Sequence, residues 1–106
     1  ATSPLLSDAS MRSLLLSDLI TFERQLRNLY TGYDGYPDAA KMALLDMVYN
    51  LGAMKLRNEY PRMNAAVLAQ DWATAAQQCN RQGINALRNQ WTQQQFEEAA
   101  GGVAQV

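Results

Sequence analysis

The 106-residue chain contains no histidine, so the commonest general base and the commonest metal ligand are both missing. Its single cysteine, Cys79, excludes a disulfide within the chain. The formal net charge is −1, without the basic excess that binds nucleic-acid phosphates or anionic membranes. No apolar run approaches the roughly 18 residues that cross a bilayer. We therefore expect no metal, no cofactor, no nucleic-acid partner and no membrane span.

The composition that remains is typical of a folded helical domain. Apolar residues make up 48% of the chain and charged residues 18%, a balance that favours a buried core over disorder. There is no internal repeat and no alternation typical of strands, and short Gly/Pro segments separate helical patterns. The sequence predicts an all-α fold: one compact domain over residues 1–106, with about five helices around a buried central helix.

The first predicted helix covers residues 7–30 and starts at Ser7 or Asp8, both favourable N-caps. Its apolar positions are spaced by threes and fours, which places them on one face. They are Met11, Leu15, Leu19, Phe22, Leu26 and Leu29. A glycine-containing turn is expected over 31–37, and Pro37 suits the start of the next helix.

The predicted central helix covers residues 38–51 and is apolar almost all round, which is typical of a helix inside a bundle. Gly52 is its expected cap. Three further helices are predicted within 60–98, after a charged connection at about 53–59. Pro61 opens the first, Asp71 caps the second, and the third covers 84–98. Residues 99–106 are predicted to be a frayed tail.

Three segments, the last in two parts, carry a family resemblance. Residues 6–19 (LSDASMRSLLLSDL) are similar to the start of the long inter-lobe helix of phage-type lysozymes. Residues 43–52 (ALLDMVYNLG) resemble that family's buried central helix. Residues 71–76 (DWATAA) and 81–91 (RQGINALRNQW) resemble its last two helices. Pesticin-like muramidases of bacteriocins and type VI secretion effectors share this layout. The order and spacing of the segments make the match more specific than any one of them.

The resemblance implies a lysozyme-like C-terminal lobe that binds the glycan strand of peptidoglycan. In that family the catalytic Glu lies in an N-terminal lobe that precedes this region, and the chain starts without an initiator Met or a signal peptide. We therefore expect a lobe that does not hydrolyse glycan alone. Its expected partners are peptidoglycan, the catalytic lobe of the parent protein and an immunity or inhibitor protein. The expected place of action is the bacterial cell wall.

The resemblance also implies which residues bind substrate. Tyr49 and Asn50 fall where the family presents an aromatic ring and an amide to the sugar cleft; alternatively, Tyr49 is core and Asn50 helps to cap the helix. Gln78 and Asn80 are further candidates for the same cleft. Arg88 could meet a peptide-stem carboxylate, or could pair locally with Asp71 or Glu97.

Within the chain itself, Glu23 and Asp34 are the candidates for the two carboxyl groups that glycoside hydrolysis requires. Glu23 would be a helix acid near the Gly/Tyr-rich turn that contains Asp34. The alternative is a solvated charge on the outer face of the first helix, with Asp34 serving the turn.

The remaining candidates have structural interpretations. Trp72 and Trp91 are expected to be core anchors of the last two helices, and Cys79 a small buried apolar residue. Residues 72–91 also have the layout of a helix-turn-helix, but the second helix offers Arg88 alone for DNA contacts. Two alternatives to the wall-binding lobe stay open: a non-enzymatic helical interaction module, and a minimal hydrolase that uses Glu23 and Asp34.

Overall fold

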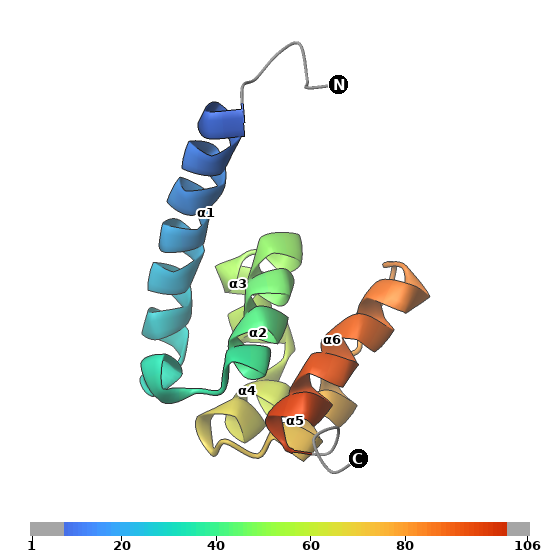
Figure 1. Ribbon diagram of the computed structural model, residues 1–106. Helices are drawn as coiled ribbons and strands as arrows, with labels where there is room; N and C mark the ends of the chain where they lie inside the picture. Colours follow the sequence, from blue (N-terminus) through green and yellow to red (C-terminus); the bar gives the residue numbers. More distant parts are fainter. Residues whose placement is uncertain (1–7, 102–106) are drawn as a thin grey trace.

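The computed structural model describes the backbone of residues 8–101 and the side chains from residue 17 onward (Figure 1). This part of the chain is all-helical, with six α-helices and one 3₁₀ turn. The elements are α1 (Asp8–Leu29), η1 (Tyr33–Gly35), α2 (Asp38–Leu51), α3 (Ala53–Glu59), α4 (Pro61–Leu68), α5 (Trp72–Gln78) and α6 (Ala86–Ala99).

Helix α2 is the centre of the bundle, with the bounds that the sequence predicts. It packs against α1, α3 and α6, and Figure 1 shows it between α1 and α6. One face of α2 is buried, because its side chains are apolar and pack against the neighbouring helices. The buried residues of α2 are Ala40, Ala43, Leu44, Met47 and Val48.

Helix α3 corrects the prediction of a charged connection after Gly52. Gly52 has φ +84°, a conformation open to glycine, and α3 starts at the next residue. The Gly52 N–H donates to the Val48 carbonyl at 2.8 Å, and the Gly52 carbonyl accepts from the Leu56 N–H at 3.1 Å. Leu56 is fully buried. Charged residues surround Leu56 in the sequence, and for this reason helix α3 was not predicted.

Side-chain caps fix the start of the last two helices. Asp71 caps α5 as predicted: its carboxylate accepts from the Thr74 N–H at 3.2 Å and from the Thr74 hydroxyl at 2.7 Å. Helix α6 begins at Ala86, later than predicted, because the Asn85 side chain accepts from the Leu87 N–H at 2.7 Å. An amide that satisfies the first free N–H sets the N-terminus of a helix.

The core is aromatic around Trp72 of α5, which lies between Tyr36, the residue after η1, and Phe96 of α6. The Tyr36 and Trp72 ring centroids lie 4.8 Å apart, and Trp72 stacks on Phe96 at 6.3 Å. Trp72 is therefore the core anchor that the sequence predicts.

The apolar stripe of α1 is only partly buried. Leu26 is fully buried, Phe22 and Leu29 pack against the core, and Leu19 is exposed. The side chains of Met11 and Leu15 lie outside the described residues, as does most of the predicted tail, 102–106.

Candidate functional site

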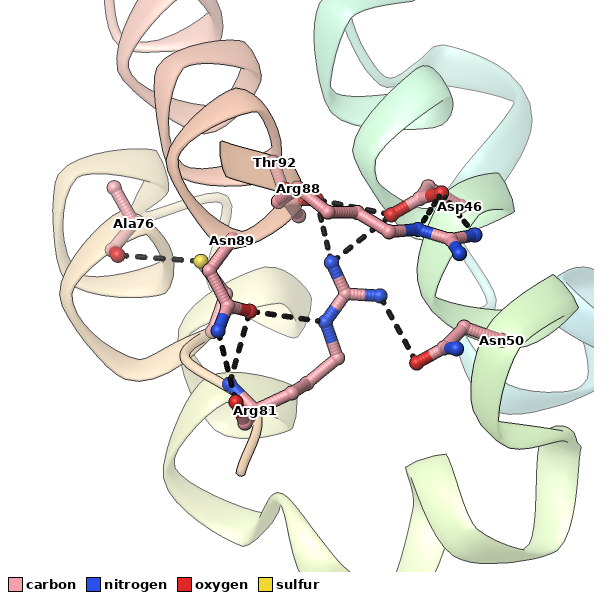
Figure 2. Close-up of polar contacts among 8 residues, drawn as sticks. Asp46, Asn50, Ala76, Arg81, Arg88, Asn89 and Thr92 are labelled. Atoms are coloured by element: carbon pink, nitrogen blue, oxygen red, sulfur yellow. Dashed lines mark hydrogen bonds and ion pairs between the residues drawn. The ribbon is translucent and has the colours of Figure 1, made fainter. Parts of the chain in front are cut away.

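The Asp46 carboxylate joins α2 to α6 and to the loop before it. Its Oδ2 accepts from Nη2 of Arg81 at 2.9 Å and from the Thr92 hydroxyl at 3.0 Å. Its Oδ1 accepts from Nε and Nη2 of Arg88, at 3.0 and 2.8 Å (Figure 2). One carboxylate thus holds two guanidinium groups, which are the strongest donors available to it.

The Arg81 side chain is fully buried at this point. Its Nη1 donates to the Asn50 side-chain oxygen at 3.4 Å, and its Nε donates to Asn89 at 3.3 Å. The Asn89 amide in turn donates to the Arg81 carbonyl at 2.8 Å (Figure 2). A buried cation is tolerated only when it is paired and hydrogen-bonded, and these contacts meet that requirement. We call Asp46, Arg81, Arg88 and Thr92, with Asn50 and Asn89, the Asp46 network.

The charges of the Asp46 network stabilise each other. Burial would by itself raise the pKa of Asp46, but the hydrogen bonds from Arg88, Arg81 and Thr92 outweigh it and hold that pKa below its ordinary value. The same pairing raises the pKa of Arg88. Arg88 therefore pairs with Asp46, and the predicted local pairing with Asp71 or Glu97 is wrong.

An apolar groove lies on one side of Asp46, between α1, α2 and α6. Its volume is about 280 Å³, and we call it the α1–α6 groove. Tyr49 is 65% exposed here and packs edge-on against Phe22, with ring centroids 5.7 Å apart. Trp91 also lines the groove and is 37% exposed, so its predicted role as a core anchor is wrong. The lining residues are Asp18, Leu19, Phe22, Met42, Leu45, Asp46, Tyr49 and Trp91.

A second, polar pocket of about 310 Å³ lies where α3 and α4 meet the end of α5. Gln78 and Asn80 both line it, together with Tyr60. We call it the Tyr60 pocket. Its other lining residues are Glu59, Pro61, Arg62 and Met63.

The structure therefore divides the predicted substrate-binding residues. Gln78 and Asn80 share the Tyr60 pocket, whereas Tyr49 lines the α1–α6 groove. Asn50 is exposed, and its side chain accepts from Arg81. Arg88 lines a separate, open pocket of about 520 Å³ that shares Asp46 and Trp91 with the groove.

The two candidate catalytic carboxylates have structural partners. Glu23, for which the alternative was a solvated charge, is half-buried and accepts from the Tyr33 hydroxyl at 2.9 Å. Burial and this hydrogen bond raise the pKa of Tyr33, so the hydroxyl stays a donor. Asp34 is exposed and accepts from Nε of Arg27 at 2.9 and 3.2 Å. Each acid links α1 to η1, which is a structural role.

Sequence reasoning missed Asp46, Arg81, Thr92 and Tyr60. The signal for Asp46 was its place in a helix predicted to be buried nearly all round, because a carboxylate there requires a basic partner. The partners of Asp46 lie within residues 81–92. They are far from Asp46 along the chain, so the sequence pattern does not predict the pairing.

Among the side chains that the structure describes, residues 17–101, no group of three or more His, Cys, Asp or Glu could hold a metal ion. Of the helices that the structure describes, none combines the length and hydropathy that a membrane crossing requires.

No protein-family model, curated protein or solved structure matches this chain.

Proposed function

We propose that this chain is the wall-glycan-binding lobe of a peptidoglycan-degrading muramidase. The catalytic lobe of the same parent protein supplies the acid for hydrolysis. The parent acts on the bacterial cell wall, in the periplasm of a target cell or after release by phage lysis or secretion. The resemblance of residues 6–19, 43–52 and 71–91 to phage-type lysozymes supports this proposal.

The Tyr60 pocket is the observation that carries the proposal. It brings two amides, Gln78 and Asn80, next to an aromatic ring from a different part of the chain. Amides donate to and accept from sugar hydroxyl and acetamido groups, and an aromatic ring packs against the C–H face of a sugar. Binding without hydrolysis is supported by Glu23 and Asp34, which are both engaged in structural contacts.

Isothermal titration calorimetry tests glycan binding. The ligand is a tetrasaccharide of alternating N-acetylglucosamine and N-acetylmuramic acid. We expect Gln78→Ala and Asn80→Ala each to weaken binding about fivefold, the value of one hydrogen bond of roughly 1 kcal/mol. Gln94→Ala, on the exposed face of α6, is the matched control and should bind normally. Equal affinity in all three variants would contradict the assignment of the pocket.

Muropeptide release from purified peptidoglycan, read by mass spectrometry, tests the absence of hydrolysis. We expect no release by the chain or by Glu23→Gln. Release by the unmodified chain that disappears in Glu23→Gln would make this chain a lysozyme in its own right and overturn the proposal.

One observation favours the second candidate, a non-enzymatic helical interaction module. The α1–α6 groove exposes large apolar side chains, as a protein-binding surface does. A chain that binds no glycan but binds an immunity or inhibitor protein would support this candidate.

A further inference from the structure

Apolar side chains of three helices stay open to solvent in the α1–α6 groove. Leu19 on α1 is 42% exposed and Met42 on α2 is 49% exposed, beside the more exposed Tyr49. Trp91 of α6 closes the other side. Scattered exposed apolar residues are normal, but a contiguous set that lines one groove marks a binding surface.

The shape of the groove suits one helix. Its walls are α1 and α6 and its floor is α2, and Figure 1 shows α1 and α6 diverging on either side of α2. Met42, Leu45 and Tyr49 follow the three-and-four spacing of one helix face, and Leu19 and Phe22 do the same on α1. An added helix can place its own apolar ridge between these rows.

The charges in the groove favour a basic occupant. The lining includes two carboxylates, Asp18 and Asp46, and no basic residue. Arg81 and Arg88 already neutralise Asp46, whereas Asp18 lies exposed on α1. A Lys or Arg at the edge of an incoming apolar face would gain a charge-assisted contact with Asp18, and an acidic residue there would be repelled.

We propose that the α1–α6 groove binds one amphipathic α-helix that carries basic residues along the edge of its apolar face. The lining residues and charges of the groove support the binding of such a helix. We expect the catalytic lobe of the parent protein to supply the helix, and this part of the proposal rests on the proposed function.

The test uses a synthetic Leu/Lys amphipathic peptide of about four helical turns. A Leu/Glu peptide of the same pattern and a scrambled Leu/Lys peptide are the controls. We expect the Leu/Lys peptide to bind with a shift of Trp91 emission to shorter wavelength, and at least about tenfold more tightly than either control. Asp18→Asn should reduce the preference for Lys over Glu.

Substitutions in the groove test whether the peptide binds there. Met42→Glu and Leu19→Glu should each abolish peptide binding, and circular dichroism checks that both variants fold. Leu68→Glu on α4 is the matched control, because Leu68 is equally exposed but lies outside the groove. Its peptide affinity should be unchanged.

Three results would overturn this inference: equal affinity for the Lys and Glu peptides, binding that survives Met42→Glu and Leu19→Glu, or self-association of the chain that Met42→Glu removes. The last would make a second copy of the chain the occupant. The proposed glycan binding is tested at Gln78 and Asn80 in the Tyr60 pocket, which shares no residue with the groove, so failure of either proposal can be recognised separately.

Discussion

Nη2 of Arg81 lies 2.9 Å from Oδ2 of Asp46, a residue 35 positions earlier in the chain, and the Arg81 side chain has no solvent exposure. This ion pair connects the loop before α6 to the central helix. A buried charge without its partner is far more costly than one with it, so the structure depends on both residues together.

Asp46→Asn should lower the free energy of unfolding by about 2 kcal/mol, because it leaves the buried Arg81 guanidinium without a counter-charge. The cost stays below that of a fully enclosed pair, since Asp46 retains some solvent contact. Urea denaturation followed by circular dichroism measures it. Asp34→Asn is the control: its pair with Arg27 is exposed, and its loss should not move the unfolding midpoint. A larger effect of Asp34→Asn would contradict this ranking.

The stability that Asp46 supplies should depend on pH in one direction. Its pKa in the folded chain lies below its ordinary value, and in the unfolded chain it is about 3.9. Ionised Asp46 therefore stabilises the fold fully above the unfolded pKa, and this contribution is lost as pH falls through the folded pKa. The difference in unfolding free energy between the unmodified chain and Asp46→Asn should be constant from neutral pH to about pH 5 and shrink below about pH 4. A difference that grows in acid would refute the assignment.

Gly83→Ala should destabilise the chain by about 1 kcal/mol, because Gly83 has φ +78° in the loop between Arg81 and α6. The space around it is open, so backbone strain alone sets the cost. Gly35→Ala provides the comparison: Gly35 is equally open and does not have positive φ. Thermal unfolding of both variants would show a lower midpoint for Gly83→Ala only. Equal midpoints would mean that the loop relaxes without cost.

Cys79 should react slowly with thiol reagents in the folded chain. It is buried, its thiol donates to the Ala76 carbonyl at 3.3 Å, and burial raises its pKa to about 11. The reactive thiolate is thus scarce at pH 8. We expect labelling by a disulfide reagent to be at least about a hundredfold slower in buffer than in denaturant. Comparable rates would show that the segment opens readily.

Local signals predicted most of the helical fold. Asp71 and Pro61 start helices where the sequence placed them, and the apolar composition of residues 38–51, between Pro37 and Gly52, identified the central helix. These signals depend on neighbours within one turn. Helix α3 was missed because its one buried anchor, Leu56, stands among charged residues, and only tertiary packing shows its role.

The candidate site was less accessible to sequence reasoning. Tyr49 and Asn50 were predicted to line one sugar cleft, but adjacent residues on a helix point about 100° apart, and the two make different contacts. Trp91 looked like core because large aromatics usually are, but it is partly exposed and lines the α1–α6 groove. The Asp46 network required contacts over more than thirty residues, which no local pattern records.

The joint at Gly52 also restricts how the length of this chain can vary. Gly52 is hydrogen-bonded both to Val48 and to Leu56, so no loop separates α2 from α3. An extra residue here would therefore change the orientation of α3 relative to α2. One inserted residue would turn α3 by roughly 100° and move Leu56 off the core. The chain then continues within one residue from α3 into α4, so the rotation would also displace Tyr60. Insertions and deletions should therefore be tolerated poorly between Val48 and Pro61.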